Sequence, residues 1–173
     1  LWDPANAKEA FLKASKIAHE NKRSVALTLS DAFCVGRYRD EFLDLIRSKT
    51  VDLVFANEAE LASLYQTDDF DKALVQLRGD ATLAVVTRSE KGCVVVAKDK
   101  VTPVPASPVK QVVDTTGAGD LFAAGFLFGT VRGLSHEQCG RLGALAAAEV
   151  IQHIGARPQT SLKALAQEAG LPA

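Results

Sequence analysis

The chain has 173 residues, of which 47% are hydrophobic and 24% charged, and its formal net charge is -1. This length and composition are typical of a globular protein with one sizeable core, so we expect residues 1–173 to form a single domain. A net charge so close to zero provides no basic field, which argues against nucleic acid or an anionic membrane surface as a partner. No apolar run reaches the length of a membrane span, and the first residues do not resemble a signal peptide. We therefore expect a cytoplasmic protein.

The cysteines and histidines show no metal-binding pattern. Neither the three cysteines nor the three histidines follow the spacing of a zinc site. We predict that the cysteines are buried free thiols and that the histidines lie on the surface or pack against helices. The residues concerned are Cys34, Cys93, Cys139, His19, His136 and His153.

The first part of the chain alternates between helical and extended patterns. Apolar residues at helical spacing predict an amphipathic helix over 5–21, and alternation over 24–29 predicts a strand. Residues 30–34 read as a turn at the carboxyl end of that strand, which is where open parallel sheets bind their ligands. A second helix over 37–48 and a short buried strand over 51–55 follow.

The next segment places an amide and a carboxylate three residues apart. Asn57 can cap a helix that runs to about residue 66, and Glu60 lies on the same face of that helix. Both residues stand at the ligand end of the preceding strand. One interpretation is a plain capping box, in which each side chain accepts a hydrogen bond from the other residue's backbone. The alternative is that the pair serves a ligand, and this segment alone leaves both open.

The middle of the chain predicts one further helix and three strands. An amphipathic helix over 69–78 precedes a strand over 83–87. A turn over 88–92 then leads into strands over 93–97 and 101–104, which we expect to form a hairpin beside a parallel sheet.

A small-residue turn then joins a predicted central strand, which ends at Val113, to a long helix. The turn reads Asp114-Thr115-Thr116-Gly117-Ala118-Gly119-Asp120. Its glycines let backbone N–H groups converge where helix amides lack partners and the macrodipole is positive, so we expect an anion there. Asp120 is then either an ordinary first-turn acid or a proton acceptor beside a reacting phosphate. The chain contains neither a P-loop motif nor the His-Arg-Asp signature of protein kinases.

The remaining pattern is helical. The helix after the turn is expected to run to about Arg132 and to stop at Gly133 in a Schellman motif. Another long helix should start at residues 135–138, continue through an alanine-rich stretch that can press close to a neighbour, and end at Gly155-Ala156. A surface helix over 161–169 closes the chain. Strands and helices joined by short connections predict an α/β fold, a three-layer α/β/α sandwich with a mostly parallel sheet.

The seven-residue turn resembles the second signature of the PfkB carbohydrate kinase family, the group of ribokinase and adenosine kinase. The resemblance implies a ribokinase-like fold and phosphorylation of a sugar-type alcohol by ATP with Mg²⁺. It also implies that Asp120 is the catalytic base and that the amides of Gly117, Ala118 and Gly119 form an anion hole. Family members are nearly twice as long. Because the chain has no methionine, we expect the ATP-binding and catalytic C-terminal part of such a kinase, packed against a missing N-terminal half that carries the lid, and able to form a homodimer.

Two further segments extend the resemblance. Asn57 and Glu60 match the family's Asn-x-x-Glu motif, whose glutamate acts on the waters around magnesium and phosphate. Thr87 and Gly92 match a Thr-x-Gly-x-x-Gly turn that holds the nucleotide phosphates, and Ser89 replaces its middle glycine. Apart from the resemblance, Thr87 is a strand-end residue and Gly92 is a turn position that favours a left-handed backbone.

The resemblance carries three more expectations. Ala144 matches a position, often asparagine, on the helix that flanks the adenine. Asp114 and Thr116 match residues that line a potassium site in several relatives, together with carbonyls of residues 150–156. The alternative for Asp114 is that it hydrogen-bonds the amides of the turn and keeps its shape.

The substrate prediction comes from the branch of the family that the chain resembles. Residues 112–157, and the turn at 29–33 ahead of the Asn-Glu-x-Glu segment, resemble adenosine kinases. Adenosine is therefore the first expected substrate, and a free sugar such as ribose or fructose is the alternative. A different class of function also stays open, in which the chain binds nucleotide but transfers no phosphate by itself.

Overall fold

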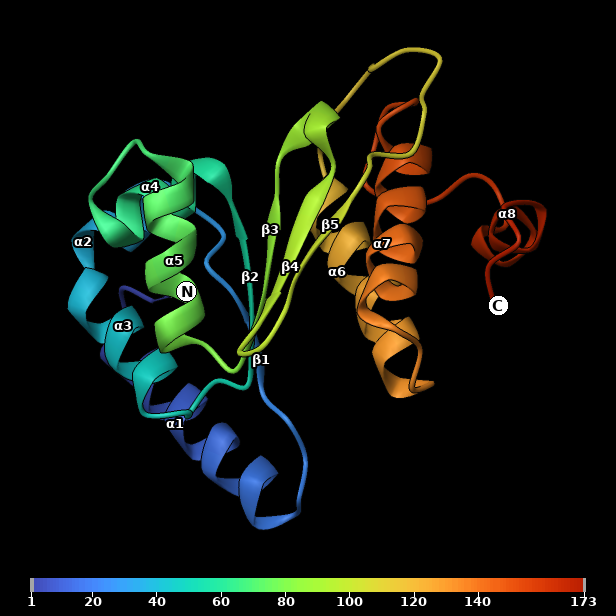
Figure 1. The fold of residues 1–173 in the computed structure, drawn as a ribbon. Coiled ribbons are helices and arrows are strands. Elements are labelled where there is room, and N and C mark those ends of the chain that lie inside the picture. The colour runs from blue at the N-terminus through green and yellow to red at the C-terminus, as the bar shows by residue number, and fades with distance from the viewer. Residues whose placement is uncertain (1, 173) are drawn as a thin grey trace. The chain divides into compact units, whose positions relative to one another are not determined.

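The computed structural model describes residues 2–172, and Figure 1 labels their helices and strands. The chain divides into two compact units. The first holds the residues up to Val86 together with Val96–Val101, and the second holds Thr87–Val95 and the residues from Thr102 onward. In chain order the elements are α1 (Ala5–Glu20), β1 (Ala26–Thr28), α2 (Ala32–Arg37), α3 (Arg39–Arg47), β2 (Leu53–Asn57), α4 (Glu58–Tyr65), α5 (Phe70–Asp80), β3 (Leu83–Thr87), the 3-10 turn η1 (Ser89–Lys91), β4 (Cys93–Ala97), β5 (Val101–Val104), α6 (Ala118–Val131), α7 (His136–Val150) and α8 (Leu162–Glu168).

The described strands form one sheet in the order β1-β2-β3-β4-β5. β1 and β2 are parallel, with Ala26 opposite Leu53. β4 and β5 form a hairpin, because the backbones of Ala97 and Lys100 exchange hydrogen bonds across a two-residue turn. The sheet is therefore mixed, and the expected α/β fold with a hairpin beside parallel strands is confirmed.

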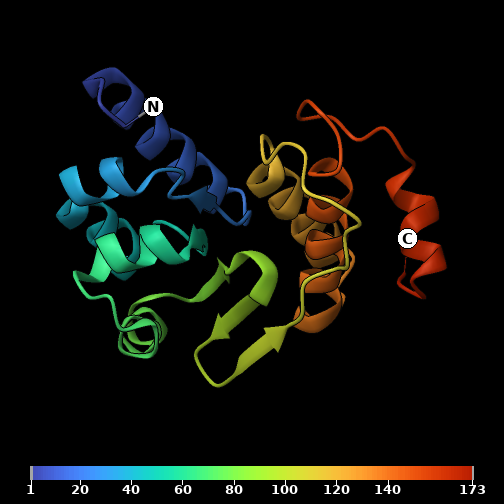
Figure 2. The same ribbon diagram turned by 90° about the horizontal axis from the view of Figure 1, so that it is seen from above.

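Helices α2 to α5 supply most of the core of the first unit. α4 packs against both α2 and α5, and these helices gather on one side of β2 in both ribbon views (Figures 1 and 2). The side chains of Leu64 on α4 and Val35 on α2 are completely buried. Leu61 on α4 and Leu77 on α5 are each only 1% exposed. Burying large aliphatic side chains of this kind stabilises a fold by about 1.5–3 kcal/mol each.

The structure corrects the prediction for residues 30–48. Residues 30–34 were expected to be a turn, but α2 starts at Ala32 because the Asp31 carboxylate accepts hydrogen bonds from the N–H groups of Phe33 and Cys34. The prediction of a single helix over 37–48 is also wrong about where that helix starts. Tyr38 has φ -118° and ψ 30°, which interrupts the helix and makes α3 begin at Arg39.

The structure also corrects the prediction of a central strand ending at Val113. Among the described residues, 105–115 belong to no strand. The N–H of Val113 donates instead to the carbonyl of Ile151, just after α7, at 2.8 Å. This segment therefore runs extended beside the end of α7 rather than inside the sheet.

Most of the predicted helix ends are confirmed. Asn57, Asp69, Ser135 and Ser161 cap α4, α5, α7 and α8 through their side chains. α6 ends in the predicted Schellman motif, because the N–H of Leu134 donates to the carbonyl of Gly129 and Gly133 has φ +70°. α7 stops at Val150, earlier than the expected Gly155-Ala156.

Two of the three cysteines are buried as predicted, and the three histidines lie at exposed or partly exposed positions, also as predicted. Cys93 and Cys139 are buried free thiols, whereas Cys34 is only partly buried. Burial raises the pKa of the Cys93 thiol to about 12, so this side chain stays protonated at neutral pH. Within residues 2–172, no group of three or more His, Cys, Asp and Glu side chains could hold a metal ion.

Helices α6 and α7 pack face to face in the second unit, and both ribbon views show them side by side (Figures 1 and 2). Glycines make the close approach possible. A Cβ built on Gly125 of α6 would lie 2.6 Å from the carbonyl oxygen of Leu142, and one built on Gly143 of α7 would lie 2.8 Å from that of Phe122. The expected close packing of the small-residue helix against a neighbour is confirmed.

The α6–α7 contact provides a first prediction. Gly125→Ala should lower the free energy of unfolding by about 1–3 kcal/mol, because its methyl group would force the two backbones apart. Gly79→Ala is the matched control, since a Cβ at this exposed position of α5 meets no atom of the described residues within 4 Å. It should stabilise the protein by about 0.5–1 kcal/mol. Urea unfolding of both variants measures the difference, and equal effects would contradict tight packing at Gly125.

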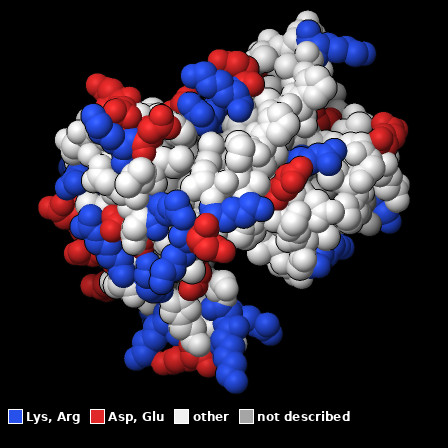
Figure 3. All heavy atoms as spheres, in the orientation of Figure 1, with Lys and Arg blue, Asp and Glu red and all other residues white. Residues whose placement is uncertain are grey.

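The surface shows no single-sign electrostatic field. In Figure 3, lysine and arginine alternate with aspartate and glutamate over the helices of the first unit, while the visible face of the second unit has few charges. This distribution agrees with the near-zero net charge. None of the described helices combines the length and the apolar character that a membrane span needs.

Candidate functional site

The glycine turn between residues 114 and 120 is shaped by its first side chain. Asp114 Oδ1 accepts hydrogen bonds from the N–H of Thr116 at 2.9 Å and from its hydroxyl at 2.7 Å. Asp114 Oδ2 accepts one from the N–H of Gly155 at 3.0 Å. These donors, led by the Gly155 amide, lower the pKa of Asp114 to about 2. The structure thus realises the alternative in which Asp114 hydrogen-bonds the turn, and its role in a potassium site stays a prediction.

The hydrogen bonds of Asp114 predict an acid-dependent stability. The pKa of about 2 in the folded state lies below the usual aspartate value of about 3.9, so the ionised carboxylate stabilises the fold above about pH 4. This contribution should be lost as the pH falls through about 2. In urea unfolding between these pH values, Asp114→Asn should show a shallower loss of stability than the wild type. Parallel curves for the two proteins would contradict the assignment.

Gly117 is the residue that lets the chain enter α6. It caps the helix with φ +80° and ψ 0°, a left-handed conformation that side chains disfavour. A Cβ built on it would also lie 2.6 Å from the Cβ of Ala156. Both the backbone angle and the close approach therefore require glycine here.

The first amides of α6 differ in what they can bind. The N–H of Ala118 already donates to the carbonyl of Thr115 at 3.1 Å, which closes the turn. Within the described residues, no acceptor is recorded for the N–H groups of Gly119 and Asp120. Among the amides of residues 117–120, the described residues provide an acceptor only for that of Ala118, and the amides of Gly119 and Asp120 are the free donors within the first turn of α6, at the positive end of the helix.

Asp120 is exposed in the first turn of α6 and follows Gly119 directly. No hydrogen bond or ion pair of its carboxylate is recorded within residues 2–172. A Cβ built on Gly119 would meet no atom of its own unit within 4 Å, so packing does not explain that glycine. The turn therefore offers two free amides and a free carboxylate on an open surface.

The residues expected to hold nucleotide phosphates lie on the turn between β3 and β4. Thr87 ends β3, Ser89 starts η1, and Gly92 follows η1 with φ +84°. A Cβ on Gly92 would lie 2.1 Å from the carbonyl oxygen of Val104, so this position needs glycine. Ser89 has φ +50°, which is a conformation that glycine adopts more easily. Ser89 therefore has a positive φ at the position where the matched motif has its middle glycine.

Ala144 lies on α7 and is 8% exposed. Its methyl group offers no polar contact to a ligand. A nucleotide base near α7 would therefore meet an apolar, closely packed helix surface at this position.

Asn57 and Glu60 belong to the first unit and form a complete capping box. Asn57 Oδ1 accepts from the N–H of Glu60 at 2.9 Å, and Glu60 Oε2 accepts from the N–H of Asn57 at 3.0 Å. The Asn57 amide also donates to Glu60 Oε1 at 2.8 Å. Glu60 is only 4% exposed, and this burial raises its pKa, against the effect of the Asn57 amide and with a smaller contribution from Asp31.

The capping box leaves Glu60 suited to an outer role around a metal. Each of its carboxylate oxygens already accepts a hydrogen bond from Asn57, yet each retains a further lone pair. Mg²⁺ keeps several of its waters in proteins and takes only one or two carboxylates. The residues fit a hydrated magnesium ion whose water donates to Glu60, and they do not form an all-protein metal cage.

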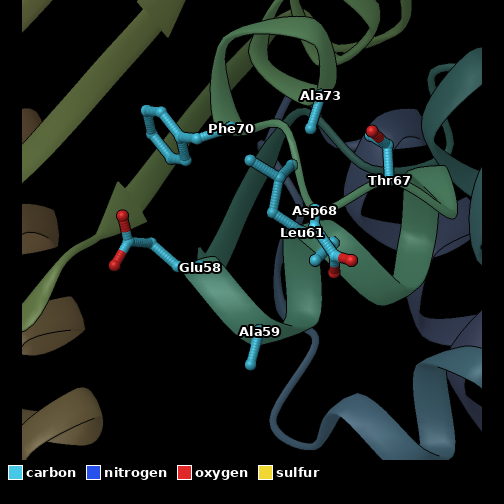
Figure 4. A pocket seen from close by; sticks show the side chains of 8 residues that line it. Glu58, Ala59, Leu61, Thr67, Asp68, Phe70 and Ala73 are labelled. Atoms are coloured by element: carbon cyan, nitrogen blue, oxygen red, sulfur yellow. The ribbon is translucent and has the colours of Figure 1, made fainter.

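A cavity of about 260 Å³ lies beside this box, between α4 and α5 of the first unit (Figure 4). The lining combines the carboxylates of Glu58 and Asp68 with apolar side chains that include Leu61 and Phe70 (Figure 4). Asn57 and Glu60 are not among the lining residues, which are Glu58, Ala59, Leu61, Ala62, Thr67, Asp68, Phe70 and Ala73.

The structure brings together part of the predicted site. The second unit holds the glycine turn, Asp120, the phosphate-turn residues and Ala144, whereas the first unit holds Asn57 and Glu60. The contacts by which Ile151, Gly155 and Ala156 shape the turn were missed from the sequence. The Gly155-Ala156 pair was interpreted as a helix stop and as part of the 150–156 segment whose carbonyls match a potassium site. Small residues after a helix also permit a close approach.

Comparisons with known proteins match nearly the whole chain to one family. The family model described as pfkB family carbohydrate kinase matches residues 2–163. A crystal structure of a probable sugar kinase from Rhizobium etli is 56% identical with a TM-score of 0.97, and covers 99% of this chain and 52% of its own. A crystal structure of adenosine kinase from Sinorhizobium meliloti is 57% identical with a TM-score of 0.95. This match covers 98% of this chain and 52% of that one.

A kinase is also found among the curated relatives, at lower identity. Cytidine kinase from Thermococcus kodakarensis is 41% identical over 126 residues, which are 68% of this chain and 45% of that protein. The chain spans about half the length of the relatives it matches.

Proposed function

Because the chain belongs to the pfkB family of carbohydrate kinases, we propose that the full-length protein transfers the γ-phosphoryl group of ATP to a hydroxyl group of a nucleoside, most specifically adenosine. The observation that supports this best is the start of α6. There the free N–H groups of Gly119 and Asp120 lie next to the free carboxylate of Asp120. Phosphoryl transfer needs a positioned hydroxyl group and positive potential around the transferred phosphate, and this turn supplies chemistry for both.

In the proposed reaction, Asp120 accepts the proton of the substrate hydroxyl group. The hydroxyl oxygen forms a bond to the γ-phosphorus as the bond from that phosphorus to the β–γ bridging oxygen breaks, which leaves ADP. The amides of Gly119 and Asp120 donate to phosphoryl oxygens that gain charge in the transition state, and the dipole of α6 adds to their effect. Asp114 and Gly117 keep these amides in place.

The nucleotide would be held by residues outside the turn. We propose that the η1 turn binds phosphate oxygens through Thr87, Ser89 and Gly92, of which Ser89 and Gly92 have positive φ angles. Ala144 would contribute an apolar surface to the adenine. Mg²⁺, when bound, neutralises phosphate charge. Glu60 would hold one of its waters, and Asn57 keeps Glu60 in position.

The substrate proposal rests on similarity. Adenosine is favoured because the structure of Sinorhizobium meliloti adenosine kinase is 57% identical over almost the whole chain. A sugar is the second candidate, because the equally similar protein from Rhizobium etli is described as a probable sugar kinase. Since the chain covers about half of these proteins, residues outside it would contribute to the choice.

Because the chain spans about half the length of its relatives, we also expect it to contact a further part of the full-length protein. Leu12 and Ile17 on α1 are 48% and 50% exposed, so these two large aliphatic side chains are available for a contact. We propose that an N-terminal half of the full-length protein covers part of the first unit. Without that half, the chain is expected to bind nucleotide weakly and to transfer no phosphate.

The test is magnesium-dependent ADP formation by the full-length protein with adenosine, cytidine, ribose and fructose in parallel. Turnover with adenosine well above the other acceptors is the expected result. Turnover only with a sugar would keep the mechanism and replace the substrate. ATP binding without turnover on any acceptor would contradict the proposed activity.

A further inference from the structure

The glycine turn at the start of α6 depends on residues 151–160, which we call the brace segment. Its residues Ile151, Gly155 and Ala156 make the contacts with the turn described above, two by hydrogen bonds and one by close packing. A shift of the brace segment would therefore move the turn and the free amides that follow it. The question is what keeps the brace segment itself in place.

Glu149, in the last turn of α7, contacts the brace segment at two places. Its Oε1 accepts hydrogen bonds from the N–H groups of Gln159 and Thr160 at 2.9 and 2.8 Å. Its Oε2 lies 3.3 Å from Nε2 of His153 near the start of the segment. A single carboxylate thus bridges both ends of the brace segment. Glu149 is 7% exposed, so water does not compete strongly for these hydrogen bonds.

A buried glutamate at this position needs a specific reason. The C-terminal end of a helix is the negative end of its dipole, where a carboxylate is unfavourable. The neighbouring residues of α7 are small or apolar, so packing alone would be satisfied by another apolar side chain. Burial by itself would raise the pKa of Glu149, but the amides of Thr160 and Gln159 and the His153 ring lower it, which keeps the carboxylate ionised at neutral pH.

We infer that Glu149 is a positioning residue for phosphoryl transfer, which holds the brace segment so that the amides of Gly119 and Asp120 keep their place. This inference rests on the proposed function of the glycine turn. Glu149 acts through the brace segment and the turn, and it touches no reacting atom. Because small displacements of catalytic groups slow a reaction more than they weaken binding, its loss should lower kcat more than it changes KM.

The first measurement compares three variants of the full-length protein at a temperature well below their unfolding transitions. Glu149→Ala should lower kcat at least about tenfold while KM for ATP stays within about threefold of the wild type. Glu149→Gln keeps an oxygen that accepts from both amides, so it should retain kcat within about threefold. Glu137→Ala, which removes an exposed acid from the first turn of the same helix, is the control and should match the wild type.

The second measurement does not require activity. Amide hydrogen exchange of residues 114–120 should be faster in Glu149→Ala than in the wild type, while exchange of residues 122–128 inside α6 should be unchanged. If the wild type transfers phosphate to no acceptor, the proposed function fails, but the exchange data still test the positioning. The inference is overturned by wild-type exchange of residues 114–120 in Glu149→Ala, by wild-type kcat in that variant, or by equal impairment of Glu149→Gln and Glu149→Ala.

Discussion

Asp120→Asn is expected to lower kcat by about 10²- to 10⁴-fold, because asparagine has the shape of aspartate but cannot accept the proton of the substrate hydroxyl group. The fold should be unaffected, since the Asp120 carboxylate is exposed and has no recorded partner among the described residues. Steady-state ADP formation at saturating ATP and adenosine measures the effect. The melting temperature of the variant should stay within a few degrees of the wild-type value, since only the interaction with the helix dipole is lost.

The same variant separates the two interpretations of Asp120. As an ordinary first-turn acid, Asp120 would only complement the helix dipole, and its removal would change stability slightly without changing kcat. As the base, its removal should leave KM for ATP unchanged or lower, because a negative charge beside the phosphates disappears. Glu137→Gln is the matched control, since it removes the first-turn acid of α7 in the same unit. A wild-type kcat in Asp120→Asn would exclude this residue as the base.

The features that could be predicted from the sequence are those whose partners lie close together in the chain. The capping box of Asn57 and Glu60 joins residues three apart, and the Schellman motif at Gly133 joins residues within one turn. The glycine turn is also local, because all seven of its residues are consecutive. Short-range hydrogen bonds need only the right residue types at the right spacing, so the sequence shows them directly.

The features that were missed depend on partners far along the chain. Val112 and Val113 have the β-branched side chains of a strand, but the hydrogen-bond partner of Val113 is Ile151, after two intervening helices. Whether an extended segment joins the sheet is decided by such distant partners. The prediction for residues 30–48 missed the division into α2 and α3 for a different reason. The cap at Asp31 and the break at Tyr38 are weak signals within an otherwise helical pattern.

Glu149 shows a third limit of sequence reasoning. Its two donors are backbone N–H groups of residues 159 and 160, and every residue except proline carries such a group. No pattern of side chains therefore indicates the contact. A single acid inside the alanine-rich stretch of α7 is the one signal that could have drawn attention to it.

Gly119→Ala and Gly117→Ala are expected to separate function from stability within one turn. Gly117→Ala should lower the free energy of unfolding by about 1–3 kcal/mol, because a left-handed alanine is strained and its methyl group would meet Ala156. Activity should fall with it as the turn shifts. The double variant Gly117→Ala/Ala156→Gly should recover the part of the loss that comes from the clash and leave the backbone strain.

Gly119→Ala should have the opposite effect on stability. A methyl group at this position meets no atom of its unit within 4 Å, and alanine favours a helix over glycine by up to about 1 kcal/mol. Yet the methyl group would stand on the open surface that the free amides face, where the phosphoryl group is proposed to bind. We expect kcat to fall by about tenfold or more while the melting temperature is equal or higher. A Gly119→Ala variant with full activity would mean that no ligand approaches this turn closely, and the anion hole would then have to lie elsewhere in the second unit.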